Sequence, residues 1–164
     1  GHRCLRHLQR PDPGFGLGAH ECRGGADGIR TTVATASRAL EASDRNAAAE
    51  CFIDYWMGSG AWQQIPKERR PAILASIVNI PHWAHALTRD PTPLDAFRRL
   101  DMPVLYMTGE RSPASSLAVA RLLAGALPDV RRVDFAGLGH MGPVTDPEPV
   151  NDEIERFLAR LTRH

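Results

Sequence analysis

The stretch PVLYMTGERSPASSLAVARLLAGALPDVRRVDF, residues 103–135, decides the fold class. Its first residues, Pro103–Thr108, form a short apolar run that ends at Gly109 and predicts a buried strand. Ser112 and Pro113 then cap and open a predicted helix with apolar residues on one face: Ala118, Val119, Leu122, Leu123 and Ala126. Arg132–Phe135 alternates polar and apolar residues and predicts a second strand. A helix between two strands predicts a parallel β-α-β unit with a right-handed crossover.

The residues that follow predict a loop and one more helix. Residues 136–146 predict the loop, and Asp146 and Pro147 begin the helix. Its apolar stripe consists of Val150, Ile154, Phe157, Leu158 and Leu161. The predicted fold class is therefore α/β, with a parallel β-α-β-α unit over residues 101–164. A parallel sheet normally has more than two strands and is covered on both faces. The other strands were thus either missed or belong to sequence that the chain does not contain.

Residues 30–100 predict a helical segment. The first expected helix is Arg30–Glu41, and the second is capped by Ser43 or Asp44 and ends at Gly58. A third begins at Pro71 and stops at Pro81. A short helical piece at Trp83 and the helix Leu94–Leu100 follow. Residues 1–29 are rich in glycine and arginine and lack apolar periodicity. They predict an irregular or disordered lead-in. A frameshift in the coding sequence would produce a similar composition, so these residues need not be native sequence.

The overall composition is that of a globular domain and excludes several classes of function. The chain has 164 residues, 43% of them hydrophobic, and a formal net charge of +1. Its basic residues are mixed with acidic ones, so we expect neither nucleic-acid binding nor attachment to a membrane surface. No apolar run is long enough to span a membrane, and the first residues lack a signal-peptide pattern. Three cysteines without framework spacing favour a reducing, cytoplasmic location.

His140 is the strongest candidate for a catalytic residue. It lies in the loop Gly137-Leu-Gly-His-Met-Gly142, directly after the second predicted strand. Glycines let the backbone turn freely, and open parallel sheets bind ligands at the carboxyl ends of their strands. An imidazole that is neutral near pH 7 and aimed into such a crevice can serve as a general base. A surface histidine in an ordinary turn is the alternative.

The region from residue 103 to 158 resembles the end of an α/β-hydrolase. In that family the last strand leads into a glycine-rich loop that bears the catalytic histidine, and a terminal helix packs back on the sheet. The segment at 30–100, with Phe-Ile-Asp-Tyr-Trp at 52–56, resembles the mobile cap that covers such active sites. The resemblance implies a hydrolase of a small ester-like or related substrate, with His140 as the base and no metal or cofactor.

The other members of the triad are harder to find. The family places an acid a few residues beyond the strand that ends at Gly109, and Ser112 stands at that position here. Glu110 is a candidate for this acid, although it is at least equally well interpreted as a solvated loop residue. Alternatively, the acid lies on an earlier strand, as in some members of the family. The nucleophile elbow Gly-x-Ser-x-Gly is missing, because Met57 and Ala61 flank Ser59 where glycines are needed. The resemblance thus implies a C-terminal portion whose front half is missing and which is inactive alone.

Candidate substrate contacts are Trp56 and Trp83 in the cap and Met141 beside the histidine, with cap core as the alternative for the tryptophans. Three further motifs are judged accidental: Gly137-x-Gly-x-x-Gly142 as a dinucleotide fingerprint, Cys4-x-x-His7 with His20-x-Cys22 as a metal site, and His82 with His85 as ligands. Two other readings are a non-catalytic binding module that retains the cap, and a truncated product without function of its own. A sheet with unpaired edges is also expected to self-associate.

Overall fold

A computed structural model describes residues 19–162 of the chain, with side chains from residue 26 onward. Nine α-helices, one 3-10 helix and two strands follow one another in this part of the chain. They are α1 (Ala19–Glu41), α2 (Arg45–Met57), α3 (Ala61–Gln64), α4 (Arg70–Ser76), η1 (Ile77–Asn79), α5 (Ile80–Arg89), α6 (Leu94–Phe97), β1 (Val104–Gly109), α7 (Ala114–Ala126), β2 (Val130–Phe135), α8 (Gly142–Thr145) and α9 (Pro147–Leu161). None of the helices in residues 19–162 is long and apolar enough to cross a membrane.

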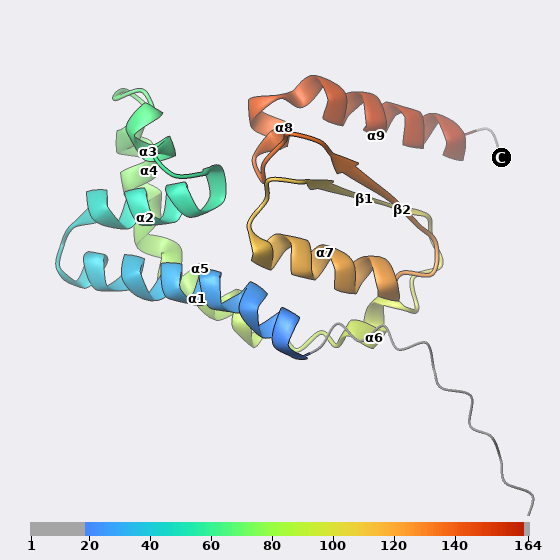
Figure 1. Cartoon of the computed structure of the whole chain (residues 1–164), viewed down its shortest axis with the longest axis horizontal. Coiled ribbons are helices and arrows are strands. Elements are labelled where there is room, and N and C mark those ends of the chain that lie inside the picture. The colour runs from blue at the N-terminus through green and yellow to red at the C-terminus, as the bar shows by residue number, and fades with distance from the viewer. Residues whose placement is uncertain (1–18, 163–164) are drawn as a thin grey trace, which may run out of the picture.

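The C-terminal half is the α/β unit that the sequence predicts. Strands β1 and β2 pair in parallel, with register from Val104 opposite Val130 to Gly109 opposite Phe135. Helix α7 connects them, and Figure 1 shows α7 and α9 on opposite sides of the sheet. The fold class is therefore confirmed as α/β, with a two-stranded parallel sheet. The short helix α8 lies inside the segment for which the sequence predicts only loop.

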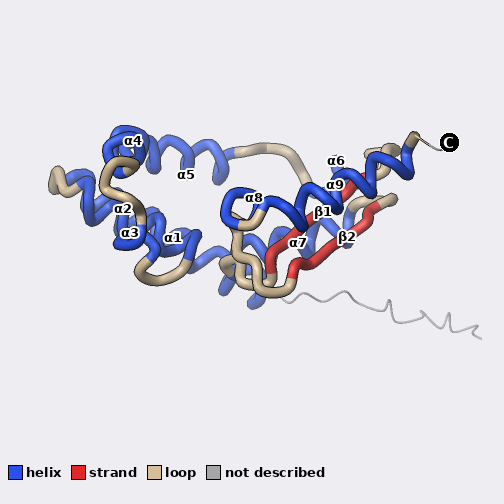
Figure 2. Tube along the Cα trace, turned by 90° about the horizontal axis from the view of Figure 1, so that it is seen from above, coloured by secondary structure: helices blue, strands red, loops and turns tan. Residues whose placement is uncertain are grey.

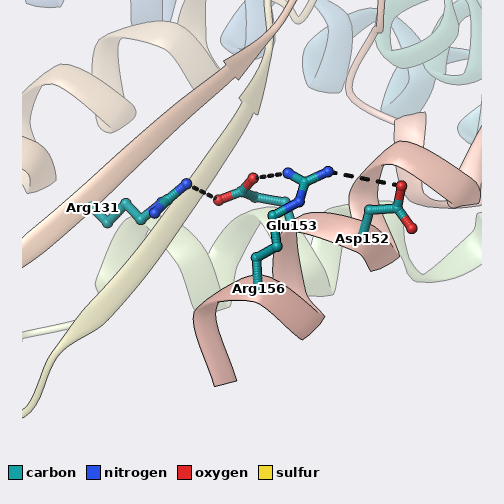
Figure 3. Close-up of polar contacts among 4 residues, drawn as sticks. All are labelled: Arg131, Asp152, Glu153 and Arg156. Carbon is teal, nitrogen blue, oxygen red and sulfur yellow. Dashed lines mark hydrogen bonds and ion pairs between the residues drawn. The ribbon is translucent and has the colours of Figure 1, made fainter. Parts of the chain in front are cut away.

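A buried carboxylate attaches α9 to the sheet. The side chain of Glu153 is 5% exposed and lies between two guanidinium groups, those of Arg131 on β2 and Arg156 on α9. Asp152 adds an outer ion pair to Arg156 at 3.8 Å, with both side chains more than half exposed (Figure 3). Because one carboxylate has a partner on each element, this chain of charges sets how α9 lies along β2.

Helix α1 is longer than the sequence predicts. It begins at Ala19, so residues 19–29 are helical where we expected irregular structure, and residues 1–18 lie outside the described part. Tertiary packing accounts for the end of this extension, because α1 contacts α2, α5 and α7, and Gly28 lies against the Tyr55 ring of α2. Such packing outweighs weak local propensity.

Helices α2 to α5 gather beyond the carboxyl ends of the strands, as Figures 1 and 2 show. Together with α1 they bury a core that consists of Ala36, Ala48, Ala49, Trp62, Ile77 and Ile80. The predicted Asp44 cap is present, since its Oδ1 accepts a hydrogen bond of 2.9 Å from the Ala47 amide. Pro81, by contrast, lies in the first turn of α5, where its missing N–H costs nothing. We predicted that Pro81 stops the helix opened by Pro71, but that helix, α4, already ends at Ser76 and Pro81 begins the next one.

Candidate functional site

A cavity of about 550 Å³ lies where the strands end and the helical group begins. Its walls come from the helices α1, α2 and α5, from β1 and the end of β2, from the first half of α7, and from the loop after β2 with the first turns of α8 and α9. Most of the lining is apolar, with Ile29, Trp56, Leu87, Val119, Phe135 and Leu138 among its members. The polar side chains that reach it are mainly hydroxyls and the imidazole of His140. A cavity of this size and character suits a small, largely apolar ligand.

Close backbone contacts hold the loop that carries His140 against the end of β1. The Arg111 amide donates to the Leu138 carbonyl at 2.9 Å, and the Glu110 amide donates to the Phe135 carbonyl at 3.1 Å. Gly109 permits this approach, because a Cβ there would lie 2.5 Å from the carbonyl oxygens of Leu138 and Gly139. Gly137 turns the chain with a φ of 76°, a conformation that glycine adopts at little cost.

The His140 ring contacts two elements that the sequence does not place beside it. Its centroid lies 4.5 Å from that of Trp56 on α2, with the planes tilted by 36°. Its Nδ1 lies 3.4 Å from the Ser116 hydroxyl on α7. Burial of the imidazole lowers the pKa of His140 below its ordinary value of 6.5, since the charged form loses hydration. The ring is therefore neutral at pH 7, as a general base must be.

Sequence reasoning missed the serines around this cavity. Ser112 is 8% exposed and lines the cavity instead of capping α7, whose N-cap is Pro113 without a side-chain hydrogen bond. Ser115 joins the Tyr55 hydroxyl of α2 at 2.7 Å and so ties the helical group to α7. The available signal was the position of Ser115 and Ser116 in the first turn of the helix after β1.

The structure brings only part of the predicted site together. Trp56 lines the cavity next to His140. Trp83 is 44% exposed, packs on Phe52 at 6.4 Å, and is not one of the lining residues. Met141 is half-buried beside His140, precedes α8, and does not line the cavity either.

Glu110 is exposed on the turn after β1 and does not line the cavity. Within residues 26–162, no ion pair or hydrogen bond joins His140 to a carboxylate; its polar partner is Ser116. The predicted role of Glu110 as the acid thus gains no contact from the structure and stays a prediction.

A metal site is not found in the described residues, in which no three His, Cys, Asp or Glu side chains gather. The Cys4-x-x-His7 and His20-x-Cys22 motif lies outside the residues whose side chains are described. Ser59 lies in the turn after α2, where Asp54 accepts hydrogen bonds from the Gly60 and Trp62 amides at 2.8 and 2.9 Å. This turn ends a helix and does not follow a strand, as a nucleophile elbow would. Its position agrees with the interpretation that Ser59 is not a nucleophile.

Comparison with known proteins adds a structural likeness. No family model matches the chain, and no curated protein matches it. Among solved structures, the chain is similar to that titled "Structure of MenH from S. aureus", with a TM-score of 0.58 and 18% sequence identity. The match covers 85% of this chain and 54% of the MenH chain, so this chain spans about half of that protein's length. At this identity the likeness shows an α/β-hydrolase-like fold alone.

Proposed function

We propose that this chain carries the cap, the catalytic base and part of the sheet of a hydrolase that acts on a small ester-like or related substrate. The observation that carries the proposal is the placement of His140 in the cavity, at the carboxyl end of a parallel strand and beneath cap-like helices. The partial α/β-hydrolase-like fold supports it.

The proposed chemistry follows from the surroundings of the imidazole. A neutral His140 takes the proton of the attacking hydroxyl or water as the bond to the substrate carbonyl forms, and later returns it to the leaving group. Trp56 packs against the otherwise exposed ring, and the apolar cavity wall offers a surface for the substrate's apolar part. Trp83 would contribute only if the cap moved toward the cavity, and Met141 only if the loop that carries His140 moved.

The nucleophile is proposed to come from sequence other than these 164 residues, which contain no Gly-x-Ser-x-Gly. Whether it is a serine or an aspartate stays open. Positioning without a nucleophile and an oxyanion hole contributes little catalysis, so we expect the 164-residue chain to be inactive alone.

Two assays test the proposal. The purified 164-residue chain should hydrolyse p-nitrophenyl acetate no faster than its His140→Ala variant. If the chain turns over the ester and both His140→Ala and Ser116→Ala abolish turnover, it contains its own nucleophile and the proposal of inactivity is wrong.

The second assay uses the longest protein that the parent coding sequence encodes. There, His140→Ala should lower kcat/KM by about 10²–10⁴-fold, the usual contribution of a general base. His85→Ala, at an exposed histidine of α5, is the matched control and should leave kcat/KM unchanged. Equal rates for both variants would exclude His140 as the base.

A binding module without catalysis is the second candidate. The observation that favours it is the lack of a carboxylate bonded to His140 within the described residues. In that case a small aromatic ester should quench the Trp56 fluorescence of the longer protein and be recovered intact. Recovery of the free acid and alcohol would reject this candidate.

A further inference from the structure

Among the residues whose side chains are described (26–162), none offers His140 the carboxylate partner that normally orients a catalytic imidazole. Such a partner accepts the hydrogen bond of one ring nitrogen, which fixes the tautomer and leaves the other nitrogen free to take a proton. Here the group at Nδ1 is the Ser116 hydroxyl, at 3.4 Å. It comes from the first turn of α7, a helix of 13 residues that contacts both α1 and β1. The hydroxyl is thus held on a packed element and not on a mobile loop.

No other charged or hydroxyl group among the described side chains forms a hydrogen bond with the ring. Glu110 and Arg111, in the turn after β1, are exposed and form no hydrogen bond with the ring. Asp54 on α2 uses both oxygens on backbone amides. Ser115, the neighbour of Ser116 in the same turn, bonds to Tyr55. Ser116 is therefore the hydroxyl of this turn that faces the imidazole.

We infer that Ser116 is a positioning residue for His140: the Nδ1–H donates to the Ser116 hydroxyl, and Nε2 is left unprotonated as the basic nitrogen. The role of Nε2 as a catalytic base rests on the proposed function, whereas the hydrogen bond between Ser116 and His140 does not. A neutral hydroxyl orients the ring as a carboxylate would, yet adds no negative charge to stabilise the imidazolium. His140 would therefore be correctly oriented but a weaker base than a histidine that is hydrogen-bonded to a carboxylate.

The tautomer of His140 tests the inference directly. Long-range ¹H–¹⁵N spectra of the 164-residue chain should show neutral His140 mainly as the Nδ1–H form. Ser116→Ala should shift the ring toward the Nε2–H form, whereas Ser116→Thr, which keeps a hydroxyl, should retain the Nδ1–H form. Ser76→Ala, at an exposed serine of α4 whose hydroxyl donates to the Ile73 carbonyl, is the control and should change nothing at His140. An identical tautomer in the wild type and in Ser116→Ala would overturn the inference.

A second measurement asks whether this position can take the usual acid. Ser116→Asp places a carboxylate at Nδ1 and should raise the pKa of His140 by about one unit or more, because an opposite charge at hydrogen-bond distance favours the imidazolium. The rate of carbethoxylation at His140, followed against pH by mass spectrometry, reports that pKa at low protein concentration. No rise in a variant that melts like the wild type would contradict the assigned geometry.

These outcomes are separate from the fate of the proposed function. A wrong base assignment would appear as an unchanged kcat/KM for His140→Ala in the longer protein, with the tautomer result intact. A wrong positioning assignment would appear in the spectra even if His140 proved catalytic.

Discussion

Gly109 is where a single missing side chain decides the position of the loop that carries His140. A Cβ at this residue would lie 2.5 Å from two backbone oxygens, and backbone cannot give way as a flexible side chain can. We expect Gly109→Ala to destabilise the fold by about 1–3 kcal/mol, the usual cost of overpacking. Urea unfolding provides the measurement.

The matched control for this substitution is Gly125→Ala in α7, where a new Cβ meets nothing within 4 Å. It should be neutral or stabilise the protein by up to about 1 kcal/mol, since alanine is the better helix former. Equal midpoints for the two variants would show that the close approach at Gly109 does not constrain the loop.

Trp56 is expected to govern the protonation of His140. Its ring covers the imidazole, and burial lowers the pKa of His140. Trp56→Ala should therefore raise that pKa toward 6.5, as the charged form regains hydration. Carbethoxylation rates against pH report the change. Trp83→Ala, which removes a tryptophan that packs on Phe52, should leave the pKa of His140 where it is.

The same lowered pKa makes stability depend on pH. Below pH 6.5 the unfolded chain binds a proton at His140 before the folded chain does. This group's contribution to stability is thus complete above pH 6.5 and is lost as the pH falls toward the folded-state pKa. In Trp56→Ala this part of the acid dependence should become smaller.

At the scale of elements, Glu153 is the residue that attaches α9 to the sheet. Removing it leaves Arg131 and Arg156 without their shared carboxylate, and its own side chain is 5% exposed. Loss of one member of a fully buried pair costs about 3–5 kcal/mol, and less where the partners are partly hydrated. We therefore expect Glu153→Ala to cost about 1–3 kcal/mol by urea unfolding.

Asp152→Ala provides the control for the Glu153 substitution. It removes the outer, exposed carboxylate of the same charge chain, and such pairs contribute about 0–1 kcal/mol. A loss at Asp152 as large as that at Glu153 would mean that the buried carboxylate does not set the position of α9.

Element prediction succeeded where local signals were strong and failed where contacts decided. The Asp44 cap, Gly58 and the proline at Pro147 marked helix ends that the structure confirms. Residues 19–29 became helical because α1 packs against other helices, information that no local window contains. Likewise Ser112 looked like a helix cap, but its hydroxyl lines the cavity while Pro113 occupies the cap position.

For the whole molecule, the open edge of β1 predicts self-association. Within the described residues, β1 pairs with β2 alone, and the Val104 and Glu110 amides point toward β2. By alternation, the amides of Leu105, Met107 and Gly109 point to the unpaired side. An unpaired strand edge is a template for another chain. Light scattering after size exclusion should therefore show dimers or larger species that grow with concentration.

Hydrogen exchange identifies the surface involved. If β1 edges pair, the amides of Leu105 and Met107 should become more protected as the protein concentration rises, whereas helix α9 should be unaffected. A monomer at all concentrations, with fast exchange at these two amides, would contradict association through this edge.

The sequence by itself determined the α/β class, the parallel order of the two strands and the loop that presents His140. These depend on apolar periodicity, capping residues and prolines, which act within one or two turns of chain. Only the tertiary structure decided that Trp56 covers the imidazole, that Ser116 bonds to it and that Glu110 does not. The two contacts of His140 join residues 24 and 84 positions apart, and they arise when α7 and α2 pack around the end of the sheet. The position of Glu110 depends on how the chain turns after β1.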